Sequence, residues 1–136
     1  MKRNVFGILT TLTLALSISI PLSAQTIAKA TVPFDFTVGQ TQMPAGTYEI
    51  SPLSHSAFVI RGNKTAKSDL SLFNSEEPKR GDSTAKLVFH KYGNRYYFSQ
   101  VFRGYGGVMQ LPTSKLEEEV RIAGGSVPQT TVIAAK

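Results

Sequence analysis

The sequence has no cysteine among its 136 residues. This absence excludes disulfide bonds, thiolate zinc sites, iron–sulfur clusters, a cysteine nucleophile and a lipidated cysteine anchor. Familiar catalytic and phosphate-binding motifs are missing too, because the chain has no Gly-x-Ser-x-Gly elbow and residues 104–107 lack the Gly-Lys-Ser/Thr ending of a phosphate loop. The spacing of the two histidines, His55 and His90, suggests no metal site. We therefore expect no metal, no cofactor and no catalytic residues.

Composition and length describe one folded domain. Apolar residues make up 41% of the chain and charged residues 18%, which is not the composition of a disordered protein. The length allows a single domain. The sequence has no internal repeat, and no segment after the first two dozen residues is apolar enough to cross a membrane as a helix.

The first 24 residues have the layout of a secretory signal peptide. Lys2 and Arg3 form a short positive start, an apolar run covers residues 5–22, and the small residue Ala24 precedes Gln25. We predict cleavage between Ala24 and Gln25. A transmembrane anchor is the alternative, because a run of about 18 residues is at the lower limit for crossing a bilayer.

Cleavage leaves residues 25–136, a single β-rich domain of 112 residues, and lowers the formal charge from +6 to +4. A domain of this length buries roughly two-thirds of the surface that its unfolded chain exposes, so one core is feasible. The expected location is secreted or periplasmic. An exported domain without disulfides depends on that core alone.

Alternating apolar residues predict short β-strands along most of this domain. In residues 31–38, Val32, Phe34, Phe36 and Val38 share one face, which is the period-2 pattern of a half-buried strand. Further strands are predicted at residues 47–50, 57–61, 67–73, 87–92, 95–102 and 130–133. A polar loop is expected at residues 74–84, and a loop or bulged edge at residues 103–111.

The clearest turn and the only helix are predicted from local signals. Glycine in the first position of the Gly93-Asn94 pair suits a two-residue type II′ hairpin. Ser114 and Glu117 have the spacing of a capping box, which predicts a short helix that stops at the glycines of residues 124–125. Six or seven short strands and one C-terminal helix predict an all-β fold, either a small antiparallel sandwich or a partly open barrel.

Three segments resemble those of a known group of proteins. Residues 32–39 read VPFDFTVG, residues 43–48 read MPAGTY, and residues 86–98 read KLVFHKYGNRYYF. In combination they resemble a family of short exported bacterial proteins with a VPFxFxVG…LPAGxY opening and a LVFHxYGxxYF hairpin. Met43 stands where that pattern has leucine. The resemblance covers most of the chain after residue 25 and implies an exported, β-rich domain; it carries no catalytic or binding residues with it.

The predicted hairpin has two unequal faces. A two-residue turn places three cross-strand pairs on one face: Tyr92 with Arg95, His90 with Tyr97, and Val88 with Ser99. The opposite face is more apolar, so we assign it to the core, with Leu87, Phe89, Lys91, Tyr96, Phe98 and Phe102. His90, Tyr92, Arg95 and Tyr97 are then expected on an open face. A three-residue turn would bring Tyr96 and Phe98 to that face instead.

The hairpin lies in a stretch that has basic but no acidic residues. Residues 83–116 contain no Asp or Glu and five Lys or Arg, and seven aromatic residues lie between Phe89 and Tyr105. A cation attracts an anionic ligand, and a ring beside it offers a stacking surface. The candidate ligand-binding residues are His90, Tyr92, Arg95, Tyr97, Arg103 and Tyr105. The structural alternative is that the aromatic residues fill strands and the basic residues keep an edge soluble.

The favoured function is an exported, non-enzymatic binding or cell-envelope interaction module. Its expected partner is an anionic or carbohydrate component of the envelope, and no sequence-specific nucleic acid partner is expected. A small secreted hydrolase or other enzyme is one alternative, which requires His55 or His90 beside a carboxylate in a pocket. A structural protein that self-associates through edge strands is another.

Overall fold

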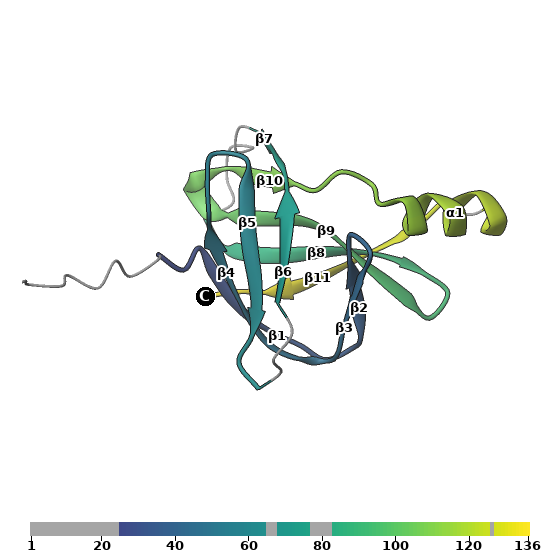
Figure 1. The fold of residues 1–136 in the computed structure, drawn as a ribbon, viewed down its shortest axis with the longest axis horizontal. Helices are drawn as coiled ribbons and strands as arrows, with labels where there is room; N and C mark the ends of the chain where they lie inside the picture. Colours follow the sequence, from purple (N-terminus) through teal and green to yellow (C-terminus); the bar gives the residue numbers. More distant parts are fainter. Residues whose placement is uncertain (1–24, 65–67, 77–82, 126) are drawn as a thin grey trace, which may run out of the picture.

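A computed structural model of the chain describes residues 25–64, 68–76, 83–125 and 127–136 (Figure 1). The predicted signal peptide and Ala24 lie outside the described residues, and Gln25 is the first residue within them. The described part is mostly β-strand, with one short helix, α1 (Lys115–Gly124), near its end. The predicted all-β fold with a single C-terminal helix is confirmed. No helix in the described ranges is long and apolar enough to cross a membrane.

The strands form two sheets. The first is antiparallel and has the order β1-β4-β5-β6, with β1 (Ala28–Val32), β4 (Gly46–Pro52), β5 (Ala57–Gly62) and β6 (Ser68–Leu72). The second has the order β11-β8-β9-β10-β7, with β11 (Gln129–Ala134), β8 (Ala85–Tyr92), β9 (Arg95–Arg103), β10 (Val108–Gln110) and β7 (Asn74–Glu76). A short 3-10 helix, η1 (Gly104–Gly106), joins β9 to β10.

A small hairpin extends the second sheet beside β9. It consists of β2 (Phe36–Val38) and β3 (Thr41–Met43). At Thr37 and Tyr97, β2 runs parallel to β9. The prediction of a purely antiparallel fold is therefore wrong at this position. The structure has more strands than the expected six or seven because one predicted strand is divided in two, and because β3, β7 and β10 have only three residues each, too few to produce a recognisable period. For this reason β7 and β10 lie in segments that were expected to be loops.

The strand predicted at residues 31–38 is divided at Pro33 between the two sheets. Val32 ends β1 in the first sheet, and Phe36 begins β2 in the second. Proline cannot donate to a ladder, so the pairing stops where the chain turns from one sheet to the other. The predicted inward face is nevertheless correct, because Val32, Phe36 and Val38 are all buried.

The core lies between the two sheets, whose strands run across each other (Figure 1). Phe58 of β5 packs edge-on against Phe98 of β9, with ring centroids 6.1 Å apart. At one corner the sheets are joined, because the backbones of Lys29 and Lys136 exchange two hydrogen bonds of 2.9 Å. Such orthogonal packing of two twisted sheets fits the predicted sandwich. The tip of the β8–β9 hairpin projects from the sheets at the end of the molecule that carries α1.

Candidate functional site

The β8–β9 hairpin has the predicted turn and two of the three predicted pairs. Tyr92 lies opposite Arg95, and His90 lies opposite Tyr97. Gly93 has a φ of 59°, which suits the first position of a type II′ turn. The alternative of a three-residue turn is therefore wrong.

The third predicted pair is wrong because β9 contains a bulge. Val88 lies opposite Gln100 rather than Ser99, since Ser99 is an additional residue in β9. The carbonyl oxygen of Ser99 accepts a hydrogen bond of 2.8 Å from the amide of Leu111. The bulge brings the Ser99 side chain next to His90, with 3.2 Å between Oγ and Nε2.

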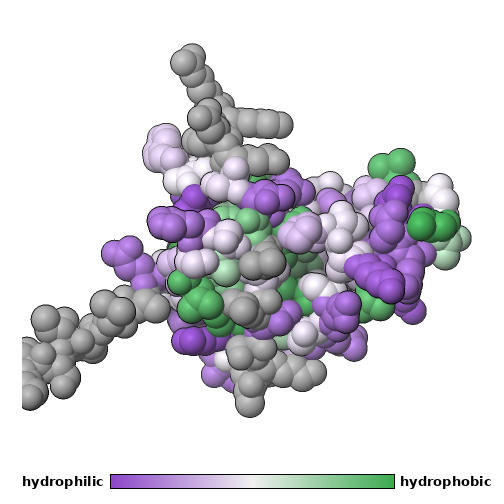
Figure 2. Space-filling view, turned by 45° about the horizontal axis from the view of Figure 1, so that its top comes forward, coloured by the Kyte–Doolittle hydropathy of each residue, from purple (hydrophilic) through white to green (hydrophobic). Residues whose placement is uncertain are grey.

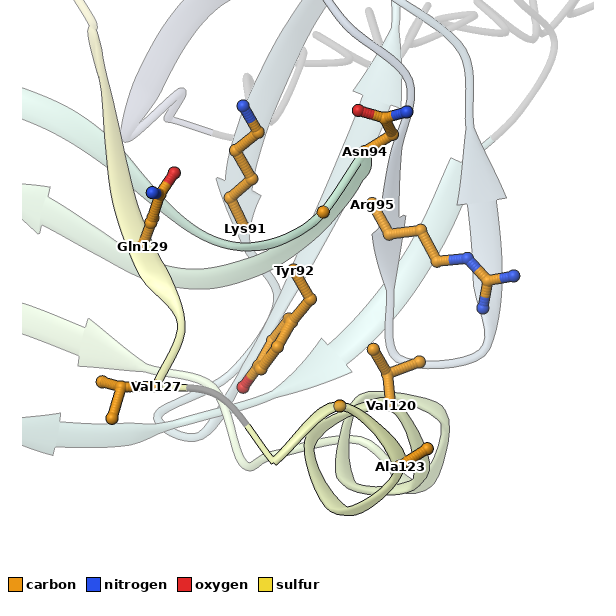
Figure 3. A pocket seen from close by; sticks show the side chains of 10 residues that line it. Lys91, Tyr92, Asn94, Arg95, Val120, Ala123, Val127 and Gln129 are labelled. Atoms are coloured by element: carbon orange, nitrogen blue, oxygen red, sulfur yellow. The ribbon is translucent and has the colours of Figure 1, made fainter.

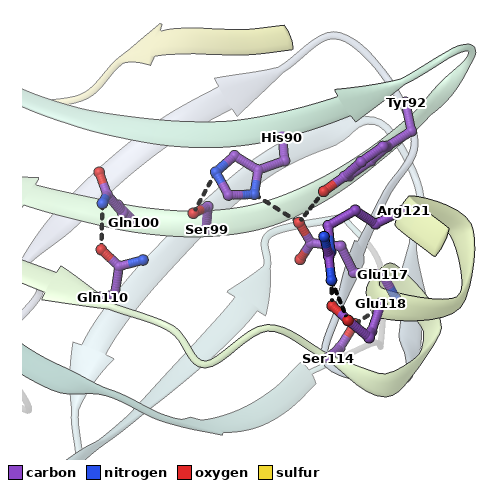
Figure 4. A network of polar contacts seen from close by, with 9 residues as sticks. All are labelled: His90, Tyr92, Ser99, Gln100, Gln110, Ser114, Glu117, Glu118 and Arg121. Atoms are coloured by element: carbon purple, nitrogen blue, oxygen red, sulfur yellow. Dashed lines mark hydrogen bonds and ion pairs between the residues drawn. The ribbon is translucent and has the colours of Figure 1, made fainter. Parts of the chain in front are cut away.

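The face expected to be open is partly covered by α1. The carboxylate of Glu117 reaches the hairpin, where its Oε1 lies 2.6 Å from Nδ1 of His90 and accepts a hydrogen bond of 3.1 Å from the Tyr92 hydroxyl (Figure 4). The Glu117 side chain is only 5% exposed. Tyr97 is buried and packs edge-on against Tyr92, with centroids 5.8 Å apart. Tyr97 is thus buried and His90 is half-buried, which corrects their expected exposure.

Glu117 was not predicted to be a site residue. One half of the predicted capping box is present, because the Ser114 hydroxyl accepts a hydrogen bond of 3.1 Å from the Glu117 amide. Its carboxylate, however, bonds to β8, 27 residues earlier, instead of reaching back to the helix start. An acidic residue in a first helical turn has a sufficient local explanation, so no local signal reveals this long-range contact. The helix ends as predicted, with Gly125 in the left-handed region at φ 56°.

The buried carboxylate is stabilised by several groups. His90 and Tyr92 bond to it directly, and the amide dipole of the first turn of α1 favours negative charge at this position. Burial and the negative charge of Glu117 raise the pKa of the Tyr92 hydroxyl from 10.0 to about 12. Tyr92 therefore remains a protonated donor throughout the physiological range.

Ser99, His90 and Glu117 are bonded in the order of a serine-hydrolase triad. A nucleophile must, however, be reachable by a substrate carbonyl. Ser99 is only 4% exposed, and neither Ser99 nor His90 lines any of the three clefts that border α1 in the described part of the chain. We interpret these contacts as a structural link between the helix and the sheet.

An open cleft lies between the hairpin tip and α1 (Figure 3). Its volume is about 810 Å³, and its walls are Lys91, Tyr92, Gly93, Asn94, Arg95, Val120, Ala123, Gly124, Val127 and Gln129. None of these residues is acidic. The Lys91 ammonium group points away from the cleft and lies over the Tyr96 ring, 5.4 Å from its centroid. Val127 is 91% exposed. We call this space the tip cleft.

A second cleft of about 520 Å³ shares Asn94, Arg95 and Val120 with the tip cleft. Its walls also include two carboxylates, Asp35 and Glu119. The exposed Arg95 therefore lies between a cleft without acidic residues and a cleft that contains two of them.

Apolar atoms are also visible at the end of the molecule that carries α1 (Figure 2), where Ile122 is 69% exposed.

Arg103 and Tyr105 do not join the other candidate residues. They follow the opposite end of β9, and the strand separates Arg103 from Arg95 by ~26 Å at a rise of about 3.3 Å per residue. Tyr105 is 85% exposed, and Arg103 is half-buried. His55 lies exposed in the turn between β4 and β5. Within the described ranges, no three potential metal ligands from His, Asp and Glu come together.

No family model, curated protein or solved structure matches the chain. A function for this chain is therefore inferred from the tip cleft. Of the six candidate ligand-binding residues, Tyr92 and Arg95 line it, Tyr97 lines the second cleft, and His90 bonds to Glu117.

Proposed function

We propose that this chain is an exported, non-enzymatic binding module that holds an anionic or carbohydrate component of the cell envelope in the tip cleft. The observation that carries the proposal is the combination of Arg95, the Tyr92 ring and apolar helix residues around one open space without an acidic wall. A volume of about 810 Å³ is within the usual range for small-molecule sites.

The walls of the tip cleft provide both a positive charge and apolar contact area. Arg95 is exposed at the rim, where its guanidinium group attracts phosphate or carboxylate and can donate two hydrogen bonds to it. Val120, Ala123 and Val127 offer apolar surface on the side of the helix. The Tyr92 hydroxyl is engaged with Glu117, so Tyr92 contributes its ring to a sugar or acyl group.

The enzyme alternative is less well supported. Its requirement for a histidine beside a carboxylate is met by His90 and Glu117, but the neighbouring Ser99 is buried and lines none of the clefts around α1. Binding needs only the open cleft, so we prefer it.

The test is retention of the purified protein on insoluble envelope polysaccharide across a series of salt concentrations. Arg95→Gln removes the rim cation, and we expect it to lower retention several-fold and to weaken its dependence on salt, because exposed charges are screened by ions. Val120→Asp, which places a carboxylate in the cleft, should also lower retention. Vesicles with anionic lipid form a parallel arm, and retention on vesicles alone would assign the anionic group to a lipid headgroup.

The matched control is Arg61→Gln. Arg61 is an exposed arginine of β5 in the other sheet, so this variant makes the same change in net charge away from the tip cleft. Equal losses for Arg95→Gln and Arg61→Gln would mean that net charge alone drives retention, and the tip cleft would lose its proposed role. Tyr92 and Tyr97 are unsuitable for alanine substitution, because one bonds to Glu117 and the other is buried.

A further inference from the structure

Among the strand edges that the structure describes, one lacks the protection that the others have. Unpaired strand edges invite pairing with another chain, and proteins guard against it with charged residues or very short edge strands. Lys29 lies in β1 and Asp69 in β6, while β3 and β7 have only three residues each. The six residues of β11, QTTVIA, carry no charge.

The outer side of β11 is exposed. The strand is the outermost of the second sheet, and among the described residues β8 is the only strand that pairs along its length (Figure 1). Alternate residues of an antiparallel strand bond to opposite sides, and the amide of Ala135 donates to Ala85 on the β8 side. The backbone groups of Thr130, Val132 and Ala134 therefore point away from β8. All three residues are exposed, and Val132 is 52% exposed.

The free part of this edge is symmetric about Val132. At one end Pro128, four residues before Val132, has no amide hydrogen and cannot continue a ladder. At the other end Lys136, four residues after Val132, already bonds to the backbone of Lys29. Between these limits the segment is rich in β-branched residues and contains neither Gly nor Pro, a composition that favours strand pairing.

We propose that β11 pairs antiparallel with β11 of a second copy of this chain, about a two-fold axis at Val132. Val132 then lies opposite its own symmetry mate, and Thr130 lies opposite Ala134. A second copy fits because both strands are uncharged, have the same free length and share the same centre, so the contact is self-complementary as a two-fold interface requires. The two seven-stranded sheets become one continuous sheet across the axis.

The test measures molecular mass against concentration by sedimentation, with the protein purified from the compartment in which the cell accumulates it. We expect the wild-type mass to rise from one copy to two. Val132→Lys places two like charges opposite each other and should weaken the dimer at least about tenfold. The matched control is Leu53→Lys, which changes another exposed apolar residue, between β4 and β5, and should leave the mass curve unchanged.

A second variant separates loss of pairing from loss of fold. Val132→Pro removes an amide that points away from β8, so it should abolish the dimer while circular dichroism still shows a folded monomer. The absence of cysteine also permits a direct reading of the register. Val132→Cys should form a disulfide-linked dimer much faster than Leu53→Cys. A wild-type protein that stays monomeric at every concentration, equal effects of the two lysine variants, or equal cross-linking of the two cysteine variants would overturn the proposal.

Discussion

Replacing His90 with alanine tests whether Glu117 holds α1 on the sheet. The variant removes the closest partner of the buried carboxylate, the imidazole nitrogen at 2.6 Å, and leaves the Tyr92 hydroxyl at 3.1 Å. The carboxylate itself stays where it is, 5% exposed, because the first turn of α1 is fixed by the Ser114 cap. The variant therefore leaves a buried charge with one hydrogen-bond donor fewer.

The expected cost follows from the burial of the pair. Leaving a buried charge without its partner usually costs about 3–5 kcal/mol. The His90 side chain is 30% exposed and Tyr92 still donates, so we expect the lower end, about 3 kcal/mol. For a domain of this length such a loss lowers the melting temperature by about 10–15 °C. This is a large part of the usual total stability of about 5–15 kcal/mol.

The assay is chemical unfolding of wild type, His90→Ala, Glu117→Ala and the double variant. We expect a coupling energy of at least about 1.5 kcal/mol between the two sites. The control is Lys29→Ala, which breaks an ion pair with Glu49 at 2.9 Å whose side chains are 49% and 36% exposed, and should cost less than about 1 kcal/mol. Single losses that add to within about 0.5 kcal/mol of the double variant would refute the reasoning, since they would mean that the two residues act independently.

Two further predictions concern the same cluster. The pKa of Tyr92 is about 12 in the folded chain, above its ordinary 10.0, so its contribution to stability is complete below pH 10 and is lost as the pH rises toward 12. Wild type should therefore lose more unfolding free energy over this window than Tyr92→Phe, measured by urea titration; an equal loss would contradict the cause assigned to the shift. Ser99 should form no adduct with a fluorophosphonate probe, checked by mass spectrometry of the intact protein, and labelling that Ser99→Ala abolishes would revive the hydrolase alternative.

Most long elements could be predicted because their signals are local. The strands around Tyr48 and Phe58 and the two strands of the hairpin follow from alternation of apolar residues, which any half-buried strand imposes. The turn at Gly93 and the helix stop at Gly125 follow from the backbone conformation that glycine permits. The candidate site was predicted in part: Tyr92 and Arg95 line the tip cleft, while Tyr97 is buried.

The features that were missed depend on contacts between distant parts of the chain. The short strands β7 and β10 exist because they pair with each other, and three residues alone have no detectable period. The bulge at Ser99 shifts part of the ladder by one residue, and no residue type in β9 demands it. The covering of the hairpin face by α1 depends on where the helix docks, which residues 114–125 do not encode by themselves.

The sequence by itself determined the all-β class, the inward faces of most strands, the tip of the hairpin and both ends of α1. It did so because these depend on sterics and hydrogen bonding within a few residues. Beyond the bulge in β9, Val101 is buried in place of the predicted Phe102. Only the tertiary structure decided that the chain changes sheets at Pro33, that Glu117 is buried against His90, and that the tip cleft has no acidic wall. Those outcomes depend on which surfaces meet, and the free energy of burial is shared among residues far apart in the sequence.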